Sequence, residues 1–79
     1  MKLTYDPKAN IAYVRLREKP AEVEALHISD EMNINLTPDG TIYGIELLNA
    51  TEQLAGDEIK RFVLENPSTG KSTEVLLPL

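Results

Sequence analysis

The sequence predicts an α+β fold: an antiparallel β-meander of about four to five strands with one short helix packed on it. Two observations lead to this prediction. Short segments in which apolar and polar residues alternate recur along the chain between turn-forming residues, as in half-buried strands. One later segment spaces its apolar residues three and four positions apart, which is typical of an amphipathic helix. The 79 residues are expected to form a single small domain, 1–79.

The first two strands are expected over residues 2–5 and 11–17. Between them, the segment Asp6-Pro7-Lys8-Ala9-Asn10 has the composition of a turn, since proline fixes φ and asparagine tolerates the left-handed region. In the second strand, apolar residues occur in both phases of the alternation near its start. This strand is therefore expected to be central near residue 11 and solvated near residue 17.

The third strand is expected over 21–28, with a change of phase that predicts a bulge near Ala25. Residues 32–36 follow as a strand with one apolar face. The segment 37–41 has proline, aspartate and then Gly40 in the order of a type I turn with a G1 bulge, which closes a hairpin. Residues 41–48 form the return strand, and Gly44 within it indicates a bulge or a close approach by another backbone.

The helix is expected after residue 50. Thr51 is a suitable N-cap, and Asp57 can cap a second helical start. Ile59, Phe62 and Val63 then lie on one apolar helical face. Residues 66–70 are expected to form a loop, and residues 72–77 a last strand.

Two stretches of this sequence resemble a family of small proteins. They read YDPKANIAYVRL from residue 5 and GIELLNAT from residue 44, with Asp39-Gly40 between them. In this order and spacing they are similar to the DUF2283 family of uncharacterised bacterial and archaeal proteins. The resemblance spans residues 5–51 and implies a small β-rich domain of unknown function. Asn10 stands where the family usually has an acidic residue, and Thr51 where it commonly has serine. Some similar proteins look like partners of small toxin-like proteins, which implies that an antitoxin-like role is conceivable.

Composition excludes several classes of function. The formal charge is −5, from 13 acidic and 8 basic side chains, which argues against nucleic acid and anionic membranes as partners. No cysteine is present, so neither a disulfide nor a cysteine-based zinc site is expected. No signal sequence and no long apolar run is found, so the expected location is the cytoplasm.

No catalytic constellation is visible in the sequence. His27 is the one histidine, and its strand neighbours predict that it faces solvent. We therefore expect no catalytic residue, no metal ligand set and no cofactor. The binding candidates are Asp6, Tyr13 and Glu46. Asp6 has the simpler role of capping its own turn, and Glu46 that of facing solvent or pairing with a cation such as Arg15.

A row of cations at positions 15, 17 and 19 has two interpretations. Arg15, Arg17 and Lys19 alternate on one strand face and could contact phosphates. The favoured interpretation is a solvated face that complements Glu22 and Glu24 on the next strand.

A protein interface is the most credible kind of site. The sheet is predicted to carry apolar residues on both faces, with the interface candidates Ile11, Tyr13 and Ile42 on one face and Val14, Leu16 and Ile45 on the other. One short helix can cover only one face, and an uncovered apolar face calls for a partner. Self-association as a homodimer is the simplest answer.

We therefore predict a non-enzymatic protein-interaction module. Its expected partners are a second copy of the chain and, in an antitoxin-like role, a small basic protein attracted by the negative charge. The alternative is a small-ligand or metal-binding domain that uses Asp6, Tyr13 and Glu46.

Overall fold

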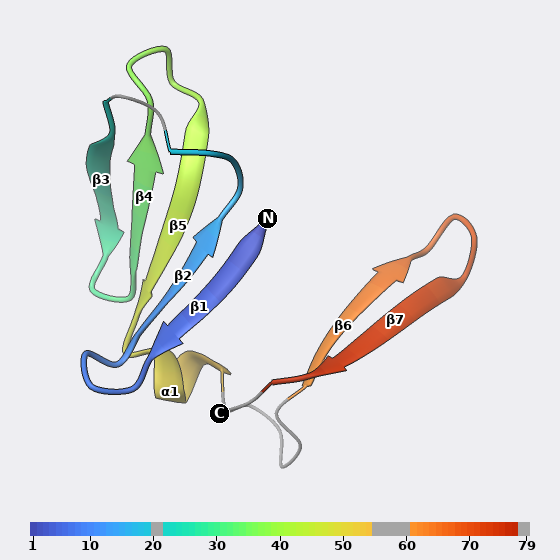
Figure 1. Cartoon of the computed structure of the whole chain (residues 1–79). Coiled ribbons are helices and arrows are strands. Elements are labelled where there is room, and N and C mark those ends of the chain that lie inside the picture. Colours follow the sequence, from blue (N-terminus) through green and yellow to red (C-terminus); the bar gives the residue numbers. More distant parts are fainter. Residues whose placement is uncertain (20–21, 55–60, 78–79) are drawn as a thin grey trace.

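The computed structural model describes residues 1–19, 22–54 and 61–77. These residues form a five-stranded antiparallel sheet, one short helix and a separate two-stranded hairpin (Figure 1). The elements follow in the order β1 (Lys2–Asp6), β2 (Ile11–Arg15), β3 (Glu24–Ser29), β4 (Met32–Leu36), β5 (Ile42–Leu48), α1 (Ala50–Leu54), β6 (Arg61–Asn66) and β7 (Lys71–Leu76). The α+β class is confirmed.

The strand order of the sheet is β1-β2-β5-β4-β3, which departs from the predicted meander. β2 pairs with β5 instead of with β3, and the chain after β2 reaches the opposite edge of the sheet. The distribution of apolar residues explains this choice. β2 and β5 carry apolar residues in both phases of their alternation, and central positions suit such strands. β3 carries a glutamate on one of its faces and a histidine on the other, so neither face is wholly apolar, and this strand lies at an edge of the sheet.

The turn at 37–41 has the predicted geometry. Two backbone hydrogen bonds close this turn: the Gly40 N–H donates to Thr37 O at 2.9 Å, and the Thr37 N–H donates to Thr41 O at 2.9 Å. Gly40 has φ of 87°, a value that residues with a Cβ rarely adopt. The turn after β1 is also as expected, since Asn10 has φ of 56°.

Two irregularities interrupt the strand pairing. The β3–β4 register shifts between His27 and Ser29, a few residues after the position predicted from the phase change at Ala25. The β4–β5 register shifts between Asn35 and Leu36, opposite Gly44, which confirms the bulge, one of the two alternatives predicted for this glycine.

The helix predicted beyond residue 57 is wrong over the residues that the structure describes. Phe62 and Val63 lie in strand β6, where Phe62 is opposite Val75 and Val63 is opposite Glu74 of β7. Asp57 and Ile59 lie outside the described residues. The apolar residues of segment 61–66 fit the period of a helix and also that of a strand. The turn at 66–70 brings β7 beside this segment as a hydrogen-bonded partner, and the segment therefore forms a strand. Gly70 in that turn has φ of 73°.

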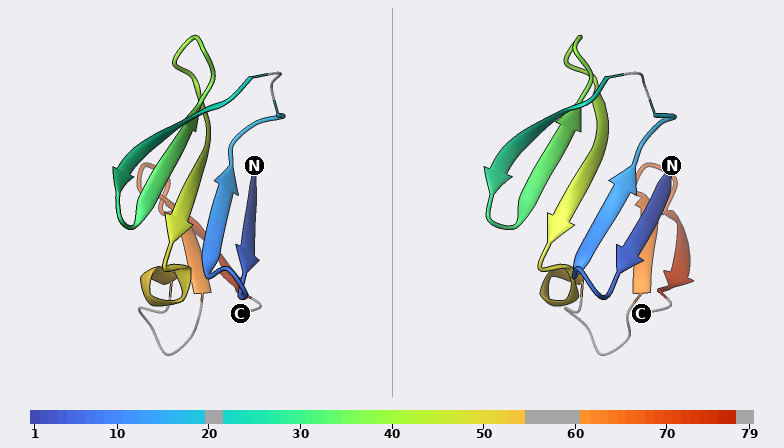
Figure 2. Two further views of the ribbon diagram at one scale, coloured as in Figure 1. Left: turned by 90° about the vertical axis from the view of Figure 1, so that its left-hand side faces the viewer. Right: turned by 60° about the vertical axis from the view of Figure 1, so that its left-hand side comes forward.

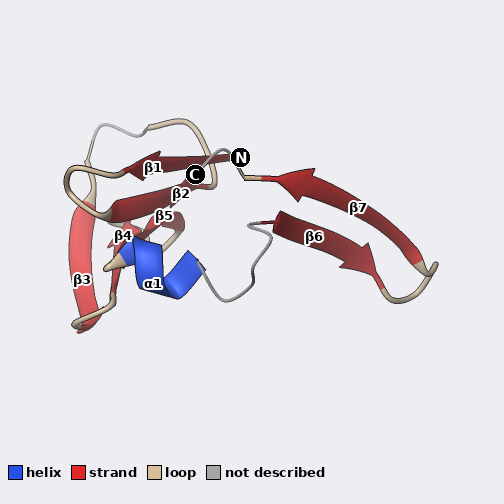
Figure 3. Cartoon of the chain, turned by 90° about the horizontal axis from the view of Figure 1, so that it is seen from below, coloured by secondary structure: helices blue, strands red, loops and turns tan. Residues whose placement is uncertain are grey.

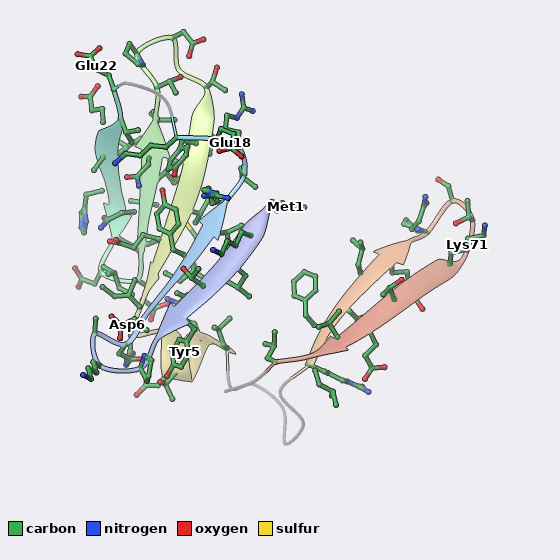
Figure 4. The ribbon with its side chains drawn as sticks, in the orientation of Figure 1. Met1, Tyr5, Asp6, Glu18, Glu22 and Lys71 are labelled. Carbon is green, nitrogen blue, oxygen red and sulfur yellow. The ribbon has the colours of Figure 1, made fainter. Side chains whose placement is uncertain are left out.

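Very little of the described chain is buried. Among its apolar residues, Ala12, Tyr43 and Ala50 are buried, and no large side chain is completely enclosed. Since 42% of the sequence is hydrophobic, most of its apolar side chains remain partly or largely exposed. Figure 4 shows side chains projecting from the sheet and from the separate hairpin. The described part of the chain therefore has apolar surfaces that its own described residues leave open.

Candidate interaction surface

One face of the five-stranded sheet is lined by aliphatic side chains. Residues directly opposite each other on paired strands share a face, so the register identifies the members of a row. One row crosses all five strands and consists of Leu3, Val14, Ile45, Ile34 and Leu26. A second row on the same side consists of Tyr5, Ala12, Leu47 and Met32. We call these nine residues the apolar face.

The apolar face is covered only at one end. There the Tyr5 hydroxyl lies 2.7 Å from the Thr51 Oγ1 of α1, and Ala50 of the same helix is buried. Figure 4 shows Tyr5 beside α1 at this end of the sheet. The outer members of the first row remain exposed, Leu3 by 39% and Leu26 by 48%. Val14, Ile34 and Ile45 in the centre are half-buried.

The opposite face is polar. Its corresponding row is Thr4, Tyr13, Glu46, Asn33 and His27. The Asn33 amide donates to Glu46 Oε1 at 2.9 Å, and its oxygen lies 2.9 Å from His27 Nδ1. The Asn35 amide donates to the Tyr13 hydroxyl at 2.6 Å. These polar side chains are half-buried at the centre of the row and exposed at its ends, and they form hydrogen bonds with one another.

The predicted binding residues are only partly brought together. Tyr13 and Glu46 are directly opposite each other on β2 and β5. Asp6 lies at the end of edge strand β1, where its carboxylate accepts from the backbone N–H groups of Lys8 at 2.9 Å and Ala9 at 3.4 Å. Asp6 thus caps its own turn, the simpler of its two predicted roles.

Glu46 pairs with an amide and not with a cation. The ion pair found among the described residues is Arg61–Glu74 at 3.0 Å, on the separate hairpin. Arg15 is the last residue of β2, while Arg17 and Lys19 follow the strand. The expected row of three cations along one strand is therefore wrong.

The interface candidates fall on the polar side of the sheet or next to a bulge. Ile11 and Tyr13 alternate on β2 and share the side of Glu46 and Leu48. Ile42 lies where the β4–β5 register shifts and is 38% exposed. Val14 and Ile45, predicted for the other face, are opposite each other on the apolar face, and Leu16 at the end of β2 is 36% exposed. An interface through Ile11, Tyr13 and Ile42 stays a prediction, and the larger aliphatic surface lies on the other side.

Sequence reasoning did not find the role of Asn10. Its side-chain oxygen accepts from the backbone N–H and the hydroxyl of Thr51, both at 2.7 Å, and its amide donates to Asn49 Oδ1 at 3.2 Å. Asn10 therefore caps α1 from 41 residues away, whereas Thr51, the predicted N-cap, lies inside the helix. One feature of the sequence could have indicated this contact: Asn10 lies in the first stretch that carries the family resemblance, and Thr51 lies in the second. This contact connects those two stretches.

The described residues offer little to other kinds of site. No group of three or more histidine, cysteine, aspartate or glutamate side chains comes together among them in a way that could hold a metal ion. None of the helices found in this part of the chain is long and apolar enough to span a membrane.

The fold and this surface define a small α+β protein whose antiparallel sheet has one polar face and one apolar face that the described residues cover only at the end near α1. Residues 2–50 match the family described as "Protein of unknown function (DUF2283)". The match covers more than half of the chain, and the chain belongs to the DUF2283 family. Neither the curated proteins nor the solved structures contain a significant match to it.

Proposed function

We propose that this protein is a non-enzymatic protein-interaction module that acts through the apolar face of its five-stranded sheet. The observation that supports the proposal is the row of five aliphatic residues, one from each strand, that no described element covers. Burying a large aliphatic side chain completely stabilises by about 1.5–3 kcal/mol, so covering Leu3 or Leu26, which are close to half-exposed, contributes about 1 kcal/mol each. The three central residues of the row are already half-buried and contribute less.

The first partner that we propose is a second copy of the chain. The chain exposes 6116 Å² of surface, whereas a folded monomer of 8.8 kDa typically exposes about 4,800 Å². The excess is about 1,300 Å² per chain, and obligate homodimers bury roughly 1,000–2,500 Å² per chain. This excess, which belongs to the whole chain and includes the surface of the separate hairpin, is within the range that a stable dimer buries.

The experiment compares two neighbouring residues on β3. Leu26→Lys places a charge on the apolar face, and His27→Lys places the same charge on the polar face one residue away. Both side chains are exposed, so neither change disturbs the packing of the monomer. We expect the wild type and His27→Lys to have twice the mass of 8.8 kDa by light scattering at micromolar concentration, and Leu26→Lys to have the monomer mass. A wild-type mass of 8.8 kDa, or a dimer in all three proteins, would contradict the proposal.

A small basic protein is the second partner that the chain's chemistry favours. The charge of −5 attracts such a partner, and an antitoxin-like protein would use the apolar face to mask it. Calorimetric titration with the small basic product of a neighbouring gene tests this role. Saturable binding that Leu26→Lys abolishes and His27→Lys retains would support it, and absence of binding would exclude it.

The polar face supports a second candidate function, the binding of a small ligand. Tyr13 and Glu46 are in register there, and Asn33 and His27 extend the same row. A ligand that binds the folded state raises Tm. A thermal-shift screen of metabolites and metal ions should then find a stabilising compound, and the effect should disappear in Glu46→Gln. A screen without any shift would remove this candidate.

A further inference from the structure

The β6–β7 hairpin is amphipathic. The register places Phe62 opposite Val75 and Leu64 opposite Thr73 on one side. The other side is mixed, since it carries the Arg61–Glu74 ion pair, Glu65 and Ser72 together with Val63 and Leu76. We call the first side, Phe62, Leu64, Thr73 and Val75, the apolar side of the hairpin.

Among the described residues, none covers either side of the hairpin. Both of its six-residue strands are exposed along their whole length, with Phe62 and Val75 at 53% and Leu64 at 65%. Neither strand pairs with the five-stranded sheet. A two-stranded hairpin is at best marginally stable in water by itself. For the hairpin to be stably folded, its apolar side therefore needs a surface on which it can pack.

The chain carries a surface of the matching kind. Figure 3 shows the hairpin standing away from the sheet, on the same side as α1. In the right-hand view of Figure 2, the hairpin lies behind the sheet. Because α1 contacts Tyr5, this is the side of the apolar face. Two uncovered apolar surfaces, one on the hairpin and one on the sheet, thus occur in one molecule.

The hairpin of a single chain is too narrow to cover its own sheet. Neighbouring strands are about 4.8 Å apart, so five strands present a face roughly 20 Å wide and a hairpin covers about two strands of it. Folding back would leave most of the apolar face open. A second copy contributes a hairpin, which covers about two strands, and also a sheet, which can cover the remaining strands.

We propose that the hairpin is an exchange arm, whose apolar side packs on the apolar face of a second copy of the chain. Each copy then donates one hairpin and accepts one, which is a closed twofold arrangement with two identical contacts. This inference rests on the proposed self-association and adds which segment makes the contact. The radius of gyration of 14.2 Å, against about 11.6 Å for a compact chain of this length, agrees with an arm held away from its own sheet.

The absence of cysteine makes the exchange directly testable in the full-length chain. Leu64→Cys labels the apolar side of the hairpin, and Leu26→Cys labels the apolar face. The two single variants are mixed, allowed to exchange subunits and treated with a flexible bis-maleimide. We expect a covalent dimer that joins residue 64 of one variant to residue 26 of the other. Val63→Cys, on the other side of the hairpin, is the matched control and should cross-link far less.

The double variant Leu26→Cys/Leu64→Cys distinguishes exchange from folding back. Exchange predicts a covalent product of twice the chain mass, even at low concentration in a preformed dimer. A closed monomer of 8.8 kDa that forms independently of concentration would overturn the exchange.

A polar variant separates this inference from the proposed function. Phe62→Ser is expected to weaken dimerisation at least about a hundredfold, since the truncation of a buried phenylalanine costs several kcal/mol. Val63→Ser should change it little. If the wild type is a dimer that Leu26→Lys dissociates but Phe62→Ser does not, the apolar face is confirmed as the interface and the exchange of hairpins is wrong. If the wild type is a monomer, both are wrong.

Discussion

At the scale of single residues, a few side chains fix the geometry of the sheet and its helix. Tyr13 crosses Gly44 on the polar face, and its hydroxyl accepts from Asn35. Asn10 joins the turn after β1 to the start of α1. Both residues belong to the stretches that carry the family resemblance. We interpret those stretches as structural, because their polar groups are used within the fold.

Gly44→Ala is predicted to destabilise the protein by about 1–3 kcal/mol, as overpacking does. A Cβ at this position would lie 2.6 Å from Cζ of the Tyr13 ring, which is too close for any contact. Urea denaturation measures the change. In the double variant Tyr13→Ala/Gly44→Ala the alanine at 44 should cost much less, since the ring that it meets is gone. Additive effects of the two changes would show that the ring is not the obstacle.

Asn10→Ala is predicted to lower the free energy of unfolding by about 2 kcal/mol, from loss of the helix cap and strain at φ of 56°. Asn10→Asp keeps an oxygen that can accept from Thr51 and tolerates this φ, so it should cost less than about 1 kcal/mol. Asn10→Gly removes the cap without the strain and should fall between them. Equal stability of the alanine and aspartate variants, measured by urea denaturation, would contradict the assigned role.

At the scale of elements, turns determine which strands pair. The turn at 37–41 aligns β4 with β5, and the turn at 66–70 aligns β6 with β7. The Thr37 hydroxyl donates to the Asp39 carboxylate, which also accepts from the Thr41 N–H at 3.1 Å. These donors lower the pKa of Asp39 from 3.8 to about 2, with the Thr37 hydroxyl as the largest cause.

The lowered pKa of Asp39 predicts a pH dependence in the turn at 37–41. Because the folded state favours the ionised carboxylate, the stabilisation is fully present above the unfolded pKa of 3.8 and is lost as pH falls through about 2. A carboxyl carbon titration by NMR should give a midpoint near 2. Thr37→Val removes the hydroxyl and should raise this midpoint toward 3.8. The same midpoint in both proteins would show that the Thr37 hydroxyl does not lower the pKa of Asp39.

At the scale of the whole molecule, the residues that the structure describes present more apolar surface than they cover. Its five-stranded sheet has a satisfied polar face and an open apolar face, and its hairpin has an open apolar side. Small domains without disulfides commonly gain the missing burial by association. Dimerisation through these surfaces would make folding and assembly a single process.

Coupled folding and assembly predicts that Tm depends on protein concentration. For a dimer of this size, a hundredfold increase in concentration should raise Tm by about 5–10 °C. Differential scanning calorimetry between micromolar and submillimolar protein measures this shift. Leu26→Lys, as a monomer, should melt at a lower temperature that does not change with concentration. A wild-type Tm that is equally constant would argue against assembly.

Much of the fold was determined by local sequence. The alternation at 32–36 and 41–48, the proline, aspartate and glycine of the turn at 37–41, and the left-handed Asn10 each depend on nearby residues, and the structure has them as predicted. The arrangement of the binding candidates was harder to predict from the sequence. Asp6 was predicted to cap its own turn, a contact within three residues, whereas the register that brings Tyr13 opposite Glu46 joins strands far apart in the chain.

Only the tertiary structure decided the features that depend on distant partners. The segment 61–66 fits a helix and a strand alike, and pairing with β7 made it a strand. The order β1-β2-β5-β4-β3 followed from which strands could bury both faces, and it pairs β2 with a strand far along the chain. The cap of α1 by Asn10 needed the same long-range closure. Sequence by itself determined where this chain bends and which residues alternate, because those preferences are local. The tertiary structure determined which apolar face stays uncovered, because that depends on contacts between segments far apart in the chain.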